Sequence, residues 1–421
     1  MAKSVVDQKA RTEIENDVVS LFDKYVRIPS TSSIDSKTVP STPEQWNMLN
    51  EVARDLEQRG ARVEIDRTNA FVYATVSASR PGTPFGVGAH VDSSPDQPGA
   101  GIEPQYHRNY QGGEICFPKA PGLVLSPADT PELTKFIGDT IITSAGDTLL
   151  SADDKAGVAA IVAAVGMWQR YPNLPRPEVT AFITRDEEVG RGVDGIDIKK
   201  LPRFCYTIDG SMPGELEYEC FDAIGVTITF KGKGVHPGLA YGKMVNAALA
   251  ASHFGALLNR DSTPERTRGR EGFTHLSEVT GNNETASMRL LLRSFEHEEN
   301  LKMLDELRRI GNAVKAAFPG LEITIEEKQQ YPNMRDYIAK APEVVEAARR
   351  AISASGLEVL ERPIRGGTDG SRLSALGVLT PNIFAGGLNF HSRTECVAVE
   401  SLVGATETIL NLGAEWTKGE V

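Results

Sequence analysis

Two acidic turns constrain the fold most, because each one directly follows a segment of strand-like composition. The first is LSADDKAG, residues 150–157, and the second is TRDEEVG, residues 184–190. After the first turn, residues 156–171 are apolar and alanine-rich enough to form a buried helix. An ionised carboxylate is costly to bury unless it is paired or bound to a metal. The turns therefore predict either solvated loop acids or a metal site at the ends of strands.

Three further motifs favour the metal site. AHVD at residues 89–92, TIDG at 207–210 and NFHS at 389–392 each follow an apolar segment, and they add histidines and carboxylates in metal-site proportions. Ligands of an open parallel sheet gather beyond the carboxyl ends of its strands. We therefore expect five side chains at such ends: His90, Asp153, Glu188, Asp209 and His391.

The overall charge and the cysteines restrict the partners and the location. The chain has 45 basic and 57 acidic residues, a formal charge of -12, which argues against nucleic acid or an anionic membrane as a partner. No segment approaches the ~20 apolar residues of a transmembrane helix, and the N-terminus does not resemble a signal peptide. Four cysteines without CxxC spacing indicate reduced thiols. We therefore predict a cytoplasmic protein.

Alternating strand and helix patterns predict an α/β catalytic domain with a mostly parallel sheet. A long segment, 93–139, is expected to be irregular, and a loop of that length is usually functional. The expected strands are 62–66, 71–77, 86–91, 140–143, 178–184, 204–208 and 382–385. The expected helices are 11–28, 44–59, 156–171, 342–355 and 399–417.

The pattern changes between residues 217 and 330. Segments 217–231 and 272–296 alternate with period two, 321–328 is a strand with one polar face, and 244–260 and 298–318 are helical. This order predicts an inserted two-layer α+β domain of ordinary domain size. The predicted boundaries are 1–216 and 331–421 for the two parts of the first domain, with the inserted domain at 217–330.

The five candidate ligands suit a pair of metal ions. Two imidazoles and three carboxylates are too many for one tetrahedral zinc but fit two zinc ions bridged by one carboxylate, for which Asp153 is the candidate. Such a centre supplies what amide hydrolysis needs. One carboxylate must stay off the metals as general base, and Glu187 is the candidate. Asp92 is expected to accept the other N–H of His90.

Eight ordered motifs resemble the peptidase T family of cytoplasmic tripeptide aminopeptidases, which belongs to the clan of co-catalytic di-zinc aminopeptidases and carboxypeptidases. They are HVDSSPD, LLSADDKAG, DEEVG, YTIDG, GVHPG, MVNA, RGGTDG and NFHSRTE, and the likeness runs from VPST at 39–42 to the C-terminal helix. Within the last motif, residues 392–394 depart from the family pattern, which affects one rim of the pocket.

The resemblance implies that the first domain is catalytic and that the inserted domain, 217–330, is its lid. It also implies specific roles for the site residues. One zinc is bound by His90, Asp153 and Asp209, and the other by Asp153, Glu188 and His391. Glu187 is the proton acceptor and Asp92 a catalytic-site residue. Relatives in the clan also imply a cis peptide bond between Asp153 and Asp154.

Four further residues are candidates for binding substrate. His236 lies in the glycine-rich GVHPG turn of the lid and could be an ordinary turn histidine, but the resemblance implies that it reaches over the metals and binds the developing oxyanion. Arg293 and Arg365 are candidates for holding a peptide carboxylate, which suits a guanidinium. Thr368 lies in the glycine-rich RGGTDG loop, where backbone can approach a ligand closely. Closure of the lid on these residues predicts that tripeptides lose their N-terminal residue.

Two other functions remain open on the sequence. The first is another amide hydrolase of the same clan, a dipeptidase or an N-acyl amino acid deacylase, which would share the metal site. The second is a peptide-binding protein without catalysis, which is expected to lack a ligand or the base, whereas all of them are present here. The predicted partners are short peptides, with neither nucleic acid nor membrane, and a homodimer is left open.

Overall fold

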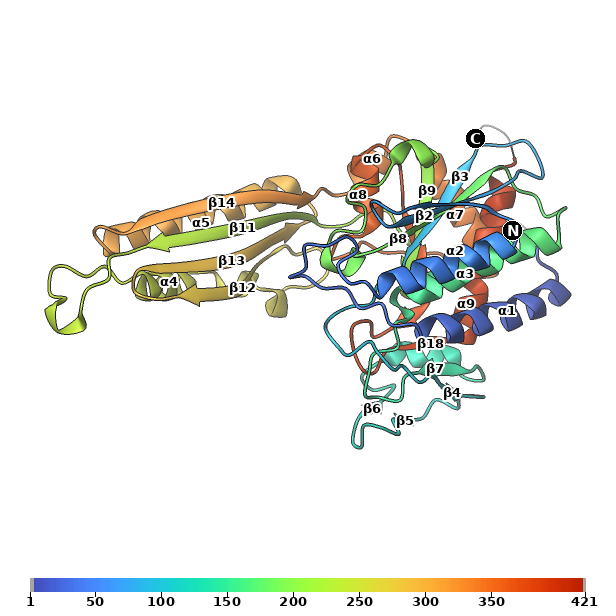
Figure 1. Ribbon diagram of the computed structural model, residues 1–421, viewed down its shortest axis with the longest axis horizontal. Coiled ribbons are helices and arrows are strands. Elements are labelled where there is room, and N and C mark those ends of the chain that lie inside the picture. Colours follow the sequence, from blue (N-terminus) through green and yellow to red (C-terminus); the bar gives the residue numbers. More distant parts are fainter. Residues whose placement is uncertain (1–3, 419–421) are drawn as a thin grey trace. The chain divides into compact units, whose positions relative to one another are not determined.

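A computed structural model describes residues 4–418 and divides into two compact units (Figure 1). Unit 1 contains the chain up to Tyr218, then Asp336–Arg362 and the chain from Thr368 onward. Unit 2 contains Glu219–Arg335 and the short segment Pro363–Gly367. The predicted lid, 217–330, did not include that short segment, which returns to unit 2 through a parallel bridge between Cys220 and Ile364.

Unit 1 is built on an eight-stranded mixed sheet in the order β1-β2-β8-β3-β9-β16-β10-β15. Its central strands β8, β3, β9 and β16 are parallel, while β1, β2 and β10 introduce antiparallel pairs. This confirms an α/β fold with parallel strands. The strands are β1 (Arg62–Asp66), β2 (Phe71–Val76), β3 (Phe85–His90), β8 (Val179–Thr184), β9 (Phe204–Gly210), β10 (Glu215–Glu217), β15 (Leu360–Glu361) and β16 (Asn382–Phe384).

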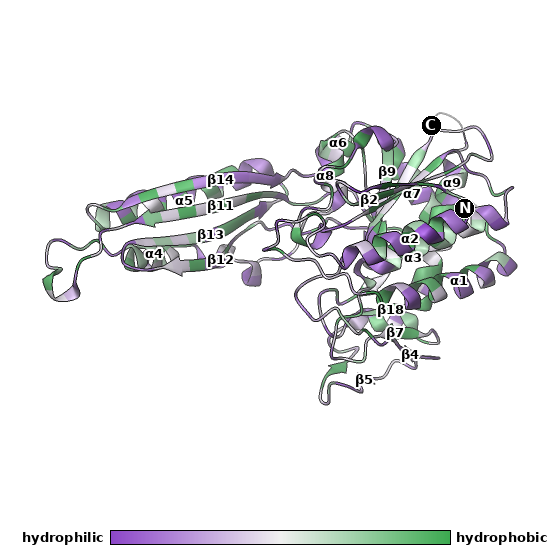
Figure 2. Cartoon of the chain, in the orientation of Figure 1, coloured by the Kyte–Doolittle hydropathy of each residue, from purple (hydrophilic) through white to green (hydrophobic). Residues whose placement is uncertain are grey.

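Helix α3 (Ala152–Arg170) is the central helix of unit 1. It packs against β3 and β9, while α1 (Gln8–Val26), α2 (Gln45–Gln58) and α9 (Val399–Glu415) pack against it. Helix α3 is buried from Ala156 to Trp168, and its alanines allow this close packing. The surface helix α1 instead shows a hydrophobic stripe beside hydrophilic residues (Figure 2). The remaining helices of unit 1 include α7 (Glu343–Ala354) and α8 (Asp369–Ala375).

A second sheet in unit 1 corrects two predictions. The strand expected at 140–143 forms as β7 (Ile141–Thr143), but it pairs with β4 and β18 in a four-stranded sheet and not in the main one. Residues 93–139, expected to be irregular, contain short elements. The additional elements are β4 (Gln105–His107), β5 (Ile115–Cys116), β6 (Val124–Leu125), the 3-10 helix Pro131–Phe136, β17 (Gly387–Leu388) and β18 (Cys396–Ala398).

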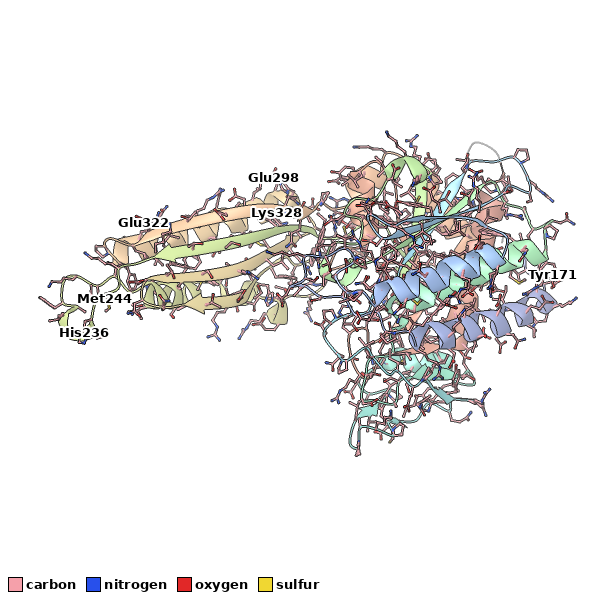
Figure 3. All side chains as sticks on the ribbon, in the orientation of Figure 1. Tyr171, His236, Met244, Glu298, Glu322 and Lys328 are labelled. Atoms are coloured by element: carbon pink, nitrogen blue, oxygen red, sulfur yellow. The ribbon has the colours of Figure 1, made fainter. Side chains whose placement is uncertain are left out.

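Unit 2 is a two-layer α+β unit. Its antiparallel sheet has the order β12-β13-β11-β14, and α4 (Ala247–Ala256) and α5 (His297–Ala317) pack on it. Alternate strand residues such as Ile228 and Met288 join Phe254 and Leu307 of the helices in one core. Polar residues such as Glu322 and Lys328 lie along β14 (Figure 3). The strands are β11 (Asp222–Lys231), β12 (Phe273–Gly281), β13 (Thr285–Ser294) and β14 (Glu322–Tyr331).

Hydropathy along the helices bears on membrane association. Among residues 4–418, none of the helices combines the length and the apolar character needed to cross a bilayer.

Candidate metal centre

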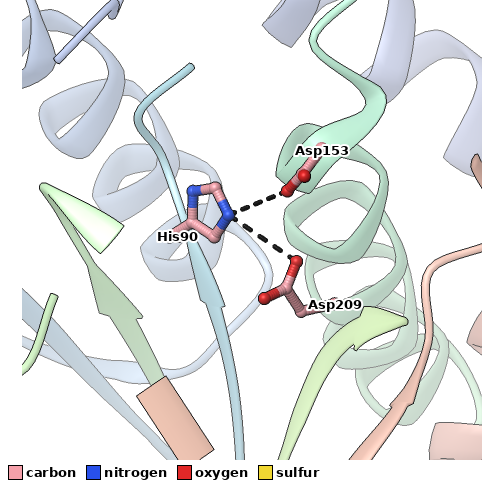
Figure 4. A group of neighbouring side chains, drawn as sticks. All are labelled: His90, Asp153 and Asp209. Atoms are coloured by element: carbon pink, nitrogen blue, oxygen red, sulfur yellow. Dashed lines mark hydrogen bonds and ion pairs between the residues drawn. The ribbon is translucent and has the colours of Figure 1, made fainter. Parts of the chain in front are cut away.

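The first ligand cluster contains His90, Asp153 and Asp209 (Figure 4). His90 is the last residue of β3, and Asp209 lies near the end of the neighbouring strand β9. The Nε2 atom of His90 lies 2.9 Å from Oδ1 of Asp153 and 3.6 Å from Oδ1 of Asp209. One nitrogen therefore faces two carboxylates, and the His90 side chain is only 2% exposed.

The second cluster shares Asp153 with the first and adds Glu188 and His391. The Nε2 atom of His391 lies 2.8 Å from Oε2 of Glu188 and 3.4 Å from Oδ2 of Asp153. Asp153 thus presents one carboxylate oxygen to each imidazole. In each cluster the ligand atoms all lie within 4.8 Å of one another. The structure brings together all five residues predicted as ligands.

Two of these residues do not lie at the end of a main-sheet strand, contrary to the expectation. Asp153 lies in the first turn of α3, ten residues beyond β7. His391 follows β17 of the second sheet and has a positive φ of 60°. The sequence suggested strand ends because both residues follow apolar segments. The intervening residues 144–150 instead form a turn in which Gly146 has a φ of 98°.

The turn at the start of α3 is held by buried polar contacts. Ser151 has a φ of 63°, and the peptide bond between Asp153 and Asp154 is cis, which confirms the sequence-based prediction. The buried carboxylate of Asp154 accepts the N–H of His90 and that of Gly157, both at 3.2 Å. This side chain ties the first turn of α3 to the end of β3.

The carboxylate of Asp92 binds the backbone of the acidic turn, whereas the imidazole of His90 lies nearer to the carbonyl oxygen of Asp92. Nδ1 of His90 lies 3.0 Å from the carbonyl oxygen of Asp92 and 3.3 Å from its Oδ1, so the backbone oxygen is the nearer acceptor. The Asp92 carboxylate accepts the N–H groups of Glu187 at 3.0 Å and Glu188 at 3.2 Å. Asp92 therefore fixes the backbone that carries the expected base and one expected ligand.

The pKa values of the site residues indicate that negative charge exceeds positive charge in the site. Hydrogen bonds to Asp153 and Glu188 raise the pKa of His391 to about 11. Burial, with the charge of Asp153, raises the pKa of Glu188 to about 8 and that of Asp209 to about 7. Burial also acts to raise the pKa of Asp153, but hydrogen bonds with His391 and His90 hold it below its ordinary value. Carboxylates packed this closely favour a bound cation.

The donor set fits divalent metals. The Oε1 atom of Glu188 is buried and has no hydrogen-bond partner within residues 4–418. A buried acceptor without a donor is unfavourable, and a cation at that oxygen would satisfy it. Two metal ions carry four positive charges, which offset the three carboxylates and leave one positive charge over. Imidazole and carboxylate ligands in this number suit zinc.

Glu187 has the features of a residue that transfers protons. Its carboxylate makes no hydrogen bond or ion pair with another residue of the described chain, 4–418, while its backbone N–H is held by Asp92. Burial is the main cause that raises the pKa of Glu187, and the charges of Asp369 and Asp209 raise it further. A free carboxylate beside the ligand Glu188 is therefore available to a substrate.

The predicted arginines lie in unit 2 and differ in their contacts. Arg365 donates to the carbonyl oxygens of Gly269 and Glu271 at 2.7 and 2.8 Å, and to Oγ1 of Thr267 at 2.9 Å. These bonds give Arg365 a role in holding that loop. The guanidinium of Arg293 lies about 6.0 Å from the ring centres of Phe273 and Tyr331, and its Nε is buried with no hydrogen-bond partner in residues 4–418.

The other two substrate-binding candidates lie in different units. His236 is exposed, in the loop that follows β11 of unit 2, and its Nδ1 accepts the N–H of Gly238 (Figure 3). The ten residues of β11 place this loop about 30 Å along the strand from Asp222, at about 3.3 Å per residue. Thr368 belongs to unit 1 and directly precedes α8.

Sequence reasoning missed several buried polar residues around the site. Asp186 accepts two hydrogen bonds from the Ser41 N–H and one from Gln45, which anchors the loop before α2 to the acidic turn. Asn382 joins Glu217 to Asp209: its Oδ1 accepts the Asp209 N–H and its Nδ2 donates to Glu217 at 2.7 Å. Only the position of Asp186 beside Glu187 could have drawn attention to it.

Comparison with known proteins identifies the class. Residues 151–414 match the model of peptidase family M20/M25/M40, and the chain belongs to that family. A protein of Geobacillus sp. named peptidase T is 40% identical over 403 residues, which cover 95% of this chain and 98% of the relative. With such relatives, the chain is a hydrolase of peptide bonds and an aminopeptidase.

Solved structures show the same fold. Aminopeptidase PepT of Bacillus cereus superposes with a TM-score of 0.73 at 21% identity, covering 96% of this chain and 99% of that one. A tripeptidase of Staphylococcus aureus gives 0.74 at 18% identity, covering 95% and 97%. A protein of Bacillus subtilis, described as a dinuclear metal-binding peptidase of the M20 family, gives 0.64 at 13% identity, covering 96% and 98%.

Proposed function

We propose that this enzyme binds two zinc ions and releases the N-terminal residue from tripeptides. The observation that carries the proposal is the placement of Asp153, whose two carboxylate oxygens face two separate imidazoles. We assign His90, Asp153 and Asp209 to one zinc ion, and Asp153, Glu188 and His391 to the other. Only Asp153 belongs to both clusters, as a bridging ligand must.

The residues around the ligands have distinct tasks in the proposed reaction. Two bound zinc ions would activate a water molecule and polarise the peptide carbonyl. Glu187 accepts the proton of the attacking water and passes it to the leaving amine, as a general base and then a general acid. The carboxylate of Asp92 accepts the backbone N–H of Glu187 and so keeps the Glu187 backbone in place. His236 is assigned to the oxyanion that forms on the carbonyl oxygen when the carbonyl carbon is attacked.

Substrate length is proposed to follow from a cation that binds the far carboxylate of the peptide. Arg293 is the better candidate, because Arg365 already donates three hydrogen bonds to the loop 267–271. Thr368 is assigned to contacts with the peptide backbone. The tripeptidase of Staphylococcus aureus, a structural relative, supports this choice of substrate.

Further parts of the proposal concern the whole enzyme. Unit 2 acts as a lid that moves as a rigid body, because it is a compact unit of its own and the chain crosses into or out of it at four points, after Tyr218, Arg335, Arg362 and Gly367. The enzyme works in the cytoplasm, which agrees with the free thiols of Cys116, Cys205 and Cys396. The oligomeric state of the enzyme is to be measured, because His236 can serve a partner subunit only in a homodimer.

A peptide length series tests the proposed function. The purified enzyme is assayed for zinc content, and kcat/KM is measured on alanine peptides of two, three and five residues and on the C-terminally amidated trimer. We expect two zinc ions per chain, a clear preference for the trimer, and a loss on amidation of about 1.5–3 kcal/mol, the range for hydrogen bonds to charged groups. Equal rates on all lengths would contradict the tripeptide assignment, and a faster dipeptide would favour a dipeptidase.

A further inference from the structure

Glu395 is a buried carboxylate. Within residues 4–418 it accepts hydrogen bonds from backbone N–H groups alone. It is 1% exposed. Its Oε2 accepts the N–H of Leu150 and that of Ser151, both at 2.8 Å, and its Oε1 accepts the N–H of Asp153 at 3.0 Å. All three donors belong to the turn that begins α3 and carries the bridging carboxylate.

This contact replaces a local helix cap. Ser151 stands at the N-cap of α3, but its side chain makes no capping hydrogen bond, and its Oγ contacts the Oγ of Ser93. The first N–H groups of a helix need acceptors and favour negative charge. Glu395, more than 240 residues away in sequence, supplies both.

Glu395 also belongs to the turn that carries His391. Residues 389–395 connect β17 to β18, and this turn is closed by the Glu395 N–H, which donates to the carbonyl oxygen of Ser392 at 3.3 Å. His391 and Asp153 are the two ligands of the second cluster whose turns Glu395 joins. The first cluster has other supports, since His90 and Asp209 lie on the adjacent strands β3 and β9.

We propose that Glu395 is a positioning residue that sets the distance between Asp153 and His391, and so selectively maintains the second metal site. This inference rests on the proposed function. The partners that hold metal ligands in place usually change metal affinity by roughly 10- to 100-fold when they are replaced. Asp153 is a ligand of both sites, but the first site keeps His90 and Asp209 on the paired strands β3 and β9, so the weakening should fall on the second site.

The substitution Glu395→Gln tests the contact to Asp153 in particular. A glutamine side chain has one acceptor oxygen, so its NH₂ group must face at least one of the three backbone N–H groups. The amide orientation that leaves fewest N–H groups unmatched keeps the oxygen on Leu150 and Ser151 and loses Asp153. Glu407→Gln is the matched control, because Glu407 is also buried but pairs with Arg11 on α1.

Metal titration of the apoprotein gives a readout separate from activity. Wild type, Glu395→Gln and Glu407→Gln are stripped with a chelator, checked by circular dichroism and thermal melting, and titrated with zinc by calorimetry. We expect wild type and Glu407→Gln to bind two ions, and Glu395→Gln to bind the first normally and the second roughly 10- to 100-fold more weakly. Excess zinc should then recover most of the kcat of Glu395→Gln.

Each contrary result has a defined meaning. Two normal binding steps in Glu395→Gln, or equal weakening of both, overturn the positioning role. If Glu395→Gln does not fold, Glu395→Asp, which keeps the charge on a shorter side chain, is judged by the same binding steps. Fewer than two ions bound by wild type overturns the proposed function itself, and the inference with it.

Discussion

The substitution Glu187→Gln separates proton transfer from metal binding. The carboxylate of Glu187 makes no hydrogen bond or ion pair within residues 4–418, so an amide of the same shape breaks none. The bond from its N–H to Asp92 is a backbone contact and is retained. Because burial raises the pKa of Glu187, a neutral amide should be tolerated at least as well as the charged group.

The expected loss is therefore confined to the chemical step. A positioned general base contributes typically 10²- to 10⁴-fold, which corresponds to about 3–5 kcal/mol in the activation barrier. We expect kcat for a tripeptide to fall by at least about 10²-fold, while the zinc content and the melting temperature stay at the wild-type values. Initial rates under saturating zinc, metal analysis and thermal melting measure the three quantities.

The neighbouring substitution Glu188→Gln is the control. Glu188 contacts His391 at 2.8 Å and belongs to the second cluster, so its replacement should reduce the zinc content together with kcat. A Glu187→Gln enzyme with near-native kcat would show that Glu187 is not the base. A loss of zinc in both variants would show that Glu187 is a ligand and that our division of roles is wrong.

Three further predictions concern the substrate-binding candidates and Glu217. Arg293→Gln should raise KM for the free tripeptide and not for its amide. Arg365→Gln should mainly lower the melting temperature. If Arg365→Gln raises KM and Arg293→Gln lowers the melting temperature, the two arginines have each other's roles. His236→Ala should lower kcat more than it raises KM, and a change in KM alone would make it a binding residue. Burial is the main cause that raises the pKa of Glu217 to about 8, and the charge of Glu215 raises it further. The stability that its proton provides is complete below about pH 4.5 and is lost as the pH rises through about 8. Glu217→Gln should therefore lose less stability to urea between pH 6 and pH 9 than wild type, and parallel curves would contradict this.

The candidate ligands, which the fold brings together, could be selected from the sequence because metal chemistry restricts residue types strongly. Two histidines and a few acids beside apolar strands leave few alternatives once an unpaired buried carboxylate is excluded. Local patterns also predicted the main helices and strands, because periodicity of 3.6 or 2 is written in consecutive residues. The segment 399–417, for example, forms α9 over Val399–Glu415.

Contacts between distant segments could not be predicted in the same way. Glu395 looked like one more acid in a polar turn, and only the fold shows that it caps α3. The strand at Ile141–Thr143 has an ordinary strand sequence, which does not say which sheet it joins. Arg365 has the expected side chain for a carboxylate, but its donors are used by a loop about 95 residues away in sequence.

The division of residues between the two units explains why the sequence predicts the chemistry more firmly than the substrate. All five candidate ligands and Glu187 lie in unit 1, whereas Arg293, Arg365 and His236 lie in unit 2. The candidate ligands in unit 1 contact one another closely, so replacing one of them disturbs the metal site. None of the candidate ligands belongs to unit 2, so its candidate residues can change without replacing a ligand. Under the roles proposed for these residues, substrate choice can change through unit 2 while the ligands are kept, and assays of substrate length, not of metal content, distinguish a tripeptidase from a dipeptidase or a deacylase.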